Sequence, residues 1–309
     1  MDRTAQHEPI RIGGTLNAPT YEGRPLANPD EDIYDQGLAF DLETLVDRRR
    51  MLKLIGFTGL SAGLVALVGC APSSGASAGS SASATSATSA AAATAAADCA
   101  VIPEETAGPF PGDGSNGPDV LSQSGVVRRD IRSSFGEYSG TAEGVPLTIK
   151  LAIQDASNGC APIADAAVYL WHCDRDGNYS LYSQAATDQN YLRGVQAAGS
   201  DGVVTFTSIF PACYSGRWPH VHFEVYRNLA AATDDANRIA TSQIALPADA
   251  CHAVYATDGY AQSVQNMNRV SLASDNVFGE DGGARQIGTV SGSPSAGYTV
   301  TLEVPVNAS

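Results

Sequence analysis

The sequence predicts an all-β fold: an antiparallel β-sandwich with long loops and a short helical segment, preceded by a disordered leader and a tether. Three observations lead to this prediction. Short apolar or alternating stretches recur throughout residues 99–309, Gly- and Pro-containing turns separate them, and only residues 249–267 have the Ala and Gln content of a helix. The folded domain therefore begins near Cys99, and the chain divides into four segments.

The first segment, residues 1–47, is polar and carries the acidic run Asp30-Glu31-Asp32 without a sustained apolar period, so we expect a disordered leader. The third segment, residues 71–98, is almost wholly Ala, Ser, Thr and Gly. Such a tract buries too little apolar surface to order itself, and it predicts a flexible tether.

The second segment, residues 48–70, resembles an export signal. Arg48 to Arg50 precede an uncharged apolar run, residues 54–69, that is short for a membrane span. The paired arginines resemble a twin-arginine signal, and Leu67-Val68-Gly69-Cys70 resembles the lipobox of bacterial lipoproteins. We therefore expect an exported, extracytoplasmic protein that is lipid-anchored through Cys70 to the outer face of a bacterial membrane. A plain membrane anchor is the alternative.

Six stretches of the fourth segment have the pattern of strands. Their apolar residues alternate with polar ones or run continuously between turn signals such as Asn158-Gly159 and Asp201-Gly202. The predicted strands are residues 147–154, 166–171, 203–209, 219–226, 239–246 and 298–306. This number of short strands favours a sandwich over a helical or mixed fold.

Net charge and cysteine spacing exclude some functions. The formal charge is −15, which disfavours nucleic acid and anionic membrane surfaces as partners. The cysteines contain no C-x-x-C pair, so a zinc ribbon is not expected, and in an exported protein their spread indicates disulfides. They are Cys70, Cys99, Cys160, Cys173, Cys213 and Cys251.

The strand after Pro219 carries two histidines on one face. His220, His222, Glu224 and Tyr226 alternate with three apolar residues, which is the pattern of a half-buried strand. The two imidazoles are about 7 Å apart along such a strand, close enough to bind one metal ion. A strand histidine is more often a surface or hydrogen-bonded residue, but the chain has only five histidines. A metal site is therefore the favoured interpretation.

Two loops add further candidate residues. Tyr214 and Arg217 lie in a stretch interrupted by Pro211, Gly216 and Pro219, which predicts a loop leading into the histidine strand. Earlier in the chain, a strand ends near Trp171 and a polar, Gly-containing loop follows it. This loop presents Tyr179, which alone would be interpreted as a packing residue.

These motifs together resemble those of the intradiol ring-cleavage dioxygenases, the catechol and protocatechuate 3,4-dioxygenase family. The likeness covers about residues 99–309, and Thr106-Ala107-Gly108-Pro109-Phe110 resembles the family's Gly-Pro-aromatic segment. The interval from Tyr214 to His220 is shorter than in the better-known members. The matching positions are Trp171, Tyr179, Tyr214, Arg217, His220 and His222.

The resemblance implies a non-haem Fe(3+) dioxygenase with Tyr179, Tyr214, His220 and His222 as metal ligands. Two phenolates and two imidazoles suit a hard ferric ion. Its substrates would be O2 and a catechol-type ring, cleaved between its hydroxylated carbons to a muconate-type diacid. The resemblance also implies that Tyr214 takes up a proton from the catechol and that Arg217 stabilises negative charge on it.

Two other functions are compatible with the sequence. His222, Glu224 and His252 could form a two-histidine, one-carboxylate ferrous site, but this uses neither tyrosine. Alternatively, the domain could be a non-enzymatic, surface-tethered β-sandwich lipoprotein that binds metal or aromatic ligands.

The positions of two cysteines suggest one disulfide. Cys173 and Cys213 each lie close in sequence to a proposed ligand tyrosine. We expect them to bond to each other and hold the two loops together.

Overall fold

The computed structural model describes residues 20–21, 24–25 and 99–308. The predicted leader, export signal and tether, with Cys70, fall almost wholly outside these residues. Within the leader, only the antiparallel pair β1 (Thr20–Tyr21) and β2 (Arg24–Pro25) is described. No helix in the described part of the chain is long and apolar enough to cross a membrane.

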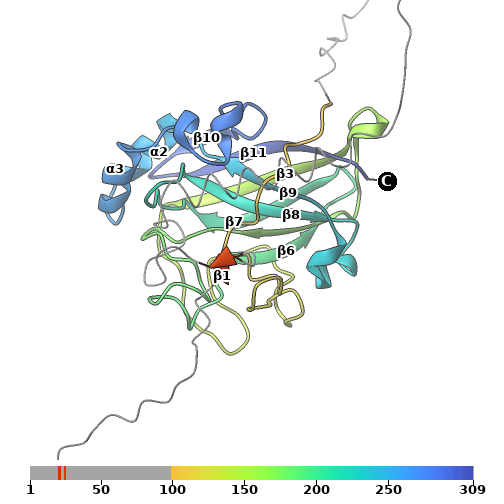
Figure 1. Cartoon of the computed structure of the whole chain (residues 1–309), viewed down its shortest axis with the longest axis horizontal. Coiled ribbons are helices and arrows are strands. Elements are labelled where there is room, and N and C mark those ends of the chain that lie inside the picture. The colour runs from red at the N-terminus through yellow and green to blue at the C-terminus, as the bar shows by residue number, and fades with distance from the viewer. Residues whose placement is uncertain (1–19, 22–23, 26–98, 309) are drawn as a thin grey trace, which may run out of the picture. The chain divides into compact units, whose positions relative to one another are not determined.

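Two β-sheets form the domain (Figure 1). The strands of the first sheet run in the order β10-β11-β3-β4, with β7 also paired to β3, and those of the second in the order β6-β5-β8-β9. The first sheet comprises β3 (Pro146–Asp155), β4 (Ala161–Pro162), β7 (Val203–Ile209), β10 (Thr289–Ser293) and β11 (Gly297–Val306). The second comprises β5 (Ala167–Trp171), β6 (Arg193–Ala197), β8 (His220–Tyr226) and β9 (Arg238–Ala245).

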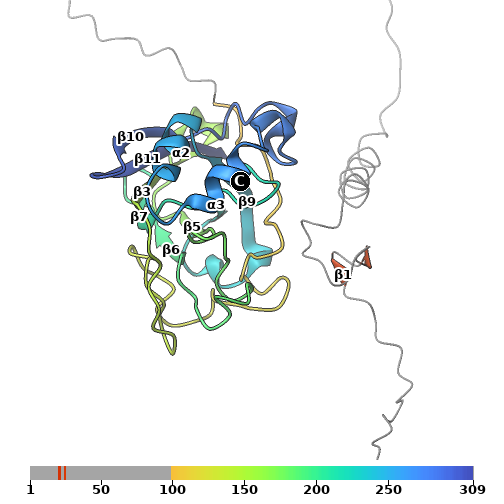
Figure 2. The same ribbon diagram turned by 90° about the vertical axis from the view of Figure 1, so that its left-hand side faces the viewer.

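The helices are short and lie towards one end of the domain, with α2 close to α3 and β10 (Figure 2). The two α-helices are α2 (Ala248–Tyr255) and α3 (Ala261–Met267). The 3-10 turns are η2 (Ala156–Asn158), η3 (Ala231–Thr233), η4 (Asp235–Asn237), η5 (Leu272–Ser274) and η6 (Phe278–Glu280).

The hydrophobic core joins the inner faces of the two sheets. Alternate residues of β3 and β11 are buried, as the period-two pattern predicts, and they belong to the same apolar cluster as inward residues of β5 and β8. Its members include Ile149, Leu151, Val168, Leu170, Val221, Phe223, Val300 and Val304. This core fixes β5 and β8, the strands that position the candidate site.

The predicted all-β sandwich is confirmed, with two corrections to its details. The β3 and β11 strands pair parallel rather than antiparallel. Parallel neighbours need a long connection, and the chain between these two strands supplies it. The helical stretch 249–267 is split in two around Gly259, whose φ of 90° lies in the left-handed region that glycine favours.

The β8 strand is buried on both faces, whereas the alternation predicted a half-buried strand. All seven of its residues are buried. Val221, Phe223 and Val225 face the core, and the polar residues on the other face are covered by loops that the strand pattern does not reveal. Its polar face is therefore an interior site.

The predicted Cys173–Cys213 disulfide is wrong. Both residues are free, buried thiols, as is Cys251. Cys173 Sγ lies 3.8 Å from the carbonyl of Ala212, and Cys213 Sγ lies 3.5 Å from that of Arg217, so the thiols contact separate carbonyl groups.

The disulfide that does form joins Cys99 to Cys160. It ties the start of the domain to the turn between β3 and β4.

Candidate metal centre

The two histidines are oriented by contacts specific to each. His220 Nδ1 lies 2.6 Å from the carbonyl oxygen of Trp218, so this nitrogen carries the proton and donates it, leaving a lone pair on Nε2. His222 stands opposite Trp171 in the pairing of β8 with β5, and its ring stacks on the indole with 4.9 Å between centroids. Both imidazoles are buried.

Tyr179 lies where the sequence predicts it, on the loop that follows β5. The loop turns at Gly177, whose φ is 91°, and the carboxylate of Asp174 accepts the backbone N–H groups of Asp176 and Asn178 at 2.9 Å. Tyr179 is buried, so the loop turns its phenol inward rather than into solvent.

Tyr214 lies on the second predicted loop, immediately before β8. Helix α3 holds this loop: Ser263 Oγ accepts the backbone N–H of Cys213 at 3.0 Å, and Asn266 Nδ2 donates to the Cys213 carbonyl at 2.9 Å. Because the predicted helix is split in two, α3 is a separate helix, and its residues Ser263 and Asn266 contact the loop that carries Tyr214.

The four predicted ligand atoms converge on one point. Tyr214 Oη lies 3.1 Å and Tyr179 Oη 3.3 Å from His220 Nε2, which in turn lies 3.0 Å from His222 Nε2. The two phenol oxygens are 3.5 Å apart. Adjacent ligands of a first-row metal ion bound at about 2.1 Å are separated by roughly 3 to 3.5 Å, which is the spacing found here.

Burial shifts the proton affinities at this cluster. It lowers the pKa of His220 and of His222 well below the usual histidine value, with the nearby Arg217 charge acting in the same direction. It raises the pKa of Tyr214 well above that of a free tyrosine, with a further contribution from Tyr179. Without a cation, burial therefore favours neutral imidazoles at His220 and His222 and a protonated phenol at Tyr214.

The donor set fits a metal ion for a further reason. His222 Nδ1 is buried without a hydrogen-bond partner among the described residues, and its Nε2 faces the lone pair of His220 Nε2. When Nδ1 carries the proton, the lone pairs of the two Nε2 atoms face each other at 3.0 Å, which is unfavourable without a cation or proton between them. A shared cation would turn the facing lone pairs into ligands. Phenolate oxygen with imidazole nitrogen is a set that suits iron.

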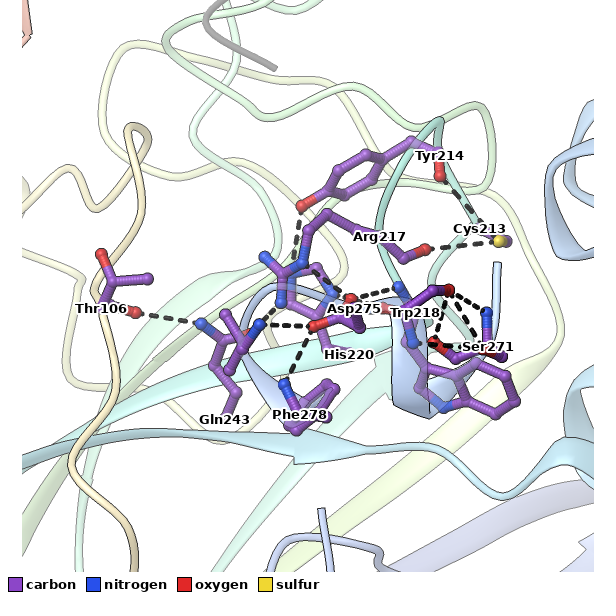
Figure 3. Close-up of polar contacts among 12 residues, drawn as sticks. Thr106, Cys213, Tyr214, Arg217, Trp218, His220, Gln243, Ser271, Asp275 and Phe278 are labelled. Atoms are coloured by element: carbon purple, nitrogen blue, oxygen red, sulfur yellow. Dashed lines mark hydrogen bonds and ion pairs between the residues drawn. The ribbon is translucent and has the colours of Figure 1, made fainter. Parts of the chain in front are cut away.

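Arg217 lies beside the donor atoms and is also buried (Figure 3). Its Nε donates to Asp275 Oδ2 at 3.0 Å in a buried ion pair, and its Nη2 donates to Gln243 Oε1 at 2.7 Å. Gln243 stands opposite His222 in the pairing of β9 with β8. The arginine therefore belongs to the site and is held by an internal ion pair rather than a surface one.

The segment from Thr106 to Phe110 also reaches the site. The Phe110 ring packs 5.0 Å from that of Tyr179 and 5.2 Å from that of Tyr182. At its other end, the Thr106 carbonyl accepts a hydrogen bond from Gln243 Nε2 at 3.0 Å. The segment thus forms a wall next to the ligand-bearing loop.

Sequence patterns did not identify Arg193, a fully buried residue at the start of β6. Its guanidinium donates to Ser180 Oγ, Tyr169 Oη and three carbonyls, those of Phe110, Pro111 and Ser180. It therefore clamps the loop that carries Tyr179 to the Phe110 segment.

The backbone next to Arg193 and Ser180 adopts uncommon conformations. Leu181 and Leu192 adopt φ values of 74° and 56°, which non-glycine residues rarely do. A Cβ atom at Gly112 would approach Arg193 Nη1 to 2.7 Å. A glycine at position 112 is therefore required by the close approach.

The competing ferrous site is not formed. His252 lies exposed on α2, whereas His222 is buried. Glu224 Oε2 accepts a hydrogen bond from Tyr226 Oη at 2.6 Å instead of turning to the imidazoles. Within the described residues, no group of three or more His, Cys, Asp and Glu side chains could hold a metal ion.

A family profile described as "Dioxygenase" matches residues 117–265. The chlorocatechol 1,2-dioxygenase of Rhodococcus opacus is 41% identical over 63 residues, which is 20% of this chain and 24% of that protein. The alignment thus spans about a quarter of that relative's length.

Solved structures share the fold. An intradiol ring-cleavage dioxygenase from Tetranychus urticae matches with a TM-score of 0.53 and 23% identity, over 68% of this chain and 96% of the solved one. Another dioxygenase crystal structure matches with a TM-score of 0.52 and 23% identity, over 68% and 95% of the two chains.

Proposed function

From the chain's resemblance to the intradiol ring-cleavage dioxygenases, which the comparisons confirm, we propose that residues 99–309 cleave a catechol-type ring between its two hydroxylated carbons with O2. The product is a muconate-type diacid that contains both oxygen atoms. The likeness also confirms the expected enzyme class, an oxidoreductase of the dioxygenase type.

The convergence of the four donor atoms is the observation that supports this proposal most strongly. Two phenol oxygens and two Nε2 atoms lie within 3.5 Å of their neighbours, and they come from three separate stretches of chain. A domain that merely binds sugars or aromatics needs no such set. We propose Fe(3+) as the ion, held by Tyr179, Tyr214, His220 and His222.

Ferric iron, when bound, supplies a Lewis acid that draws electron density from a coordinated dihydroxybenzene and prepares its ring for O2. The chain's own residues handle the protons and the orientation. Tyr214 Oη, on a loop rather than a strand, accepts a proton from a catechol hydroxyl as the substrate binds. Burial favours protonated Tyr214 because it raises the pKa of this phenol.

Arg217 supplies the positive charge that faces the anionic substrate. Its guanidinium is already held in place, so little reorganisation is needed when charge develops on the ring. The Trp171 indole stacks on His222 and keeps its Nε2 aimed at the cluster, and Phe110 covers Tyr179. Together these contacts hold the cluster within an apolar wall.

A panel of catechols tests the proposed reaction. The iron-loaded protein should take up O2 only when a catechol is present, and mass spectrometry should identify the intradiol diacid. An extradiol product would contradict the intradiol assignment. Absence of both metal-dependent colour and oxygen uptake would instead favour the non-enzymatic lipoprotein.

We also propose that the domain is exported and tethered to a membrane through Cys70. The export motif and lipobox in residues 48–70 support this, and so does the Cys99–Cys160 disulfide, because disulfides persist in oxidising compartments. Expression in a bacterium that processes lipoproteins, followed by mass spectrometry, should find a diacylated N-terminal Cys70. A Cys70→Ser variant should leave the membrane fraction, and its retention there would contradict the anchor.

A further inference from the structure

Asp275 lies between η5 and η6, beyond the part of the chain that the family profile matches. Its side chain is fully buried. Its Oδ1 accepts the backbone N–H groups of Val277 at 2.8 Å and Phe278 at 3.1 Å, which fix the carboxylate in its own segment. Its other oxygen, Oδ2, is directed at the candidate site.

Asp275 Oδ2 makes two contacts with the loop that precedes β8 (Figure 3). It accepts Arg217 Nε at 3.0 Å and the backbone N–H of Trp218 at 2.6 Å. The carbonyl of Trp218 is the acceptor that orients His220 through Nδ1. One carboxylate therefore holds both the arginine and the residue, Trp218, whose carbonyl orients a metal-ligand histidine.

The arginine is held at two different nitrogens. Asp275 binds Nε and Gln243 binds Nη2, so the position of the guanidinium and the rotation of its plane are both fixed. Gln243 is itself held by the Thr106 carbonyl through Nε2. The network thus joins four segments of the chain, which carry Thr106, Arg217, Gln243 and Asp275.

We propose that Asp275 is a positioning residue of the dioxygenase reaction, which acts through Arg217 and holds its guanidinium where the anionic catechol binds. This inference rests on the proposed function. Asp275 bonds to Arg217 and to backbone N–H groups rather than to the four donor atoms, so its effect on turnover depends on the arginine. A carboxylate that served only to fill the interior would affect stability and leave turnover per bound iron unchanged.

A double-mutant cycle separates these two roles. The variants are Asp275→Asn, Arg217→Gln and the two combined, each loaded with iron. Asp235→Asn is the control, because it breaks another Asp–Arg ion pair, with Arg238, at the opposite end of β8 from the histidines. The measurements are iron content, visible absorption, kcat and KM for catechol, and an anaerobic catechol titration of the ferric protein.

Asp275→Asn should keep its iron and lower kcat about a hundredfold, the loss typical of a misplaced catalytic group. The combined variant should match Arg217→Gln alone, because Asp275 has no effect once the arginine is gone. Wild-type kcat in Asp275→Asn, or losses that multiply in the combined variant, would overturn the proposal. If Asp275→Asn fails to fold, Asp275→Glu keeps the buried charge but displaces the carboxylate, and unchanged kcat per bound iron in that variant would overturn the proposal.

The anaerobic titration separates this inference from the proposed function. A wild type that binds iron but consumes no O2 with any catechol would contradict the proposed function alone. The role of Asp275 would then be decided by catechol affinity, which should fall at least about tenfold in Asp275→Asn and be equal in Arg217→Gln and the combined variant. Unchanged affinity in Asp275→Asn would overturn it.

Discussion

The two faces of β8 are equally buried but differ in what stabilises them. On one face, Val221 and Phe223 pack into the apolar core between the sheets. On the other, His220 and His222 set their Nε2 atoms 3.0 Å apart beside two phenol oxygens. The core face gains free energy from burial, whereas on the polar face the proposed cation would bind the four converging donor atoms. Burial alone therefore does not distinguish a core from a site.

The largest effect is expected from removing a ligand on the polar face. Tyr179→Phe and His222→Ala should abolish iron binding and turnover, because each deletes one of four converging donors. His252→Ala is the matched control, since this histidine is exposed on α2 and should leave iron content unchanged. Metal analysis of the purified proteins measures the effect. Full iron occupancy in Tyr179→Phe would break the assignment of that face as a metal site.

On the core face, we expect a loss of stability without a loss of metal. Phe223→Ala should lower the free energy of unfolding by about 3 to 5 kcal/mol, because the ring is fully buried. The iron content of the folded fraction should remain that of the wild type. Urea denaturation measures the change, and Val127→Ala, at a side chain that is 54% exposed, should stay within about 0.5 kcal/mol.

His172 sharpens the comparison because it is a buried histidine that is fully satisfied without metal. Its Nδ1 lies 2.7 Å from the Cys173 carbonyl and its Nε2 lies 2.7 Å from Ser208 Oγ. Burial lowers its pKa to about 4. Its folded-state pKa thus lies below that of the unfolded chain, so its contribution is complete above pH 6.5 and is lost as the pH falls towards 4.

This shift predicts that the wild type loses about 3 kcal/mol more stability than His172→Gln between pH 7.5 and pH 4. Urea denaturation of both proteins at several pH values gives the difference. Identical pH profiles for the two proteins would show that His172 titrates normally in the folded state.

The smallest effect is expected at the clamp behind the polar face. Arg193→Lys keeps the charge but cannot reach five acceptors, so Tyr179 should be less well positioned and iron affinity should fall about tenfold. Gly112→Ala should act in the same direction, because its Cβ would displace the guanidinium. Arg227→Lys is the control, because Arg227 is exposed and donates to the carbonyl of Ala308, away from the clamp. Equal iron affinity in all three variants would remove Arg193 from the site.

The sequence was sufficient where the signal is local. The alternation in 219–226 predicted the strand, and the order of Tyr179, Tyr214, Arg217 and the two histidines predicted which side chains converge. The strand was confirmed, because a period-two pattern fixes the face on which each residue lies. The four proposed ligand side chains also lie together, and their role as metal ligands stays a prediction. The degree of burial of β8 was not predictable, because the covering loops come from other parts of the chain.

The rest depends on contacts between distant residues. No local pattern indicates that β11 pairs parallel with β3, or that Cys99 bonds to Cys160 while Cys173 stays reduced. Arg193 and Asp275 are single charged residues without a periodic context, and only the tertiary structure shows that they are buried beside the site. Their roles follow from what they contact.

The visible absorption of the purified protein, with and without Fe(3+), tests the central claim most directly. If Tyr179 and Tyr214 bind ferric iron as phenolates, adding one equivalent should produce an intense tyrosinate-to-iron absorption band that Tyr179→Phe lacks and that changes when catechol is added without O2. A protein that binds no Fe(3+), or that binds it without this band, would contradict the proposed metal centre.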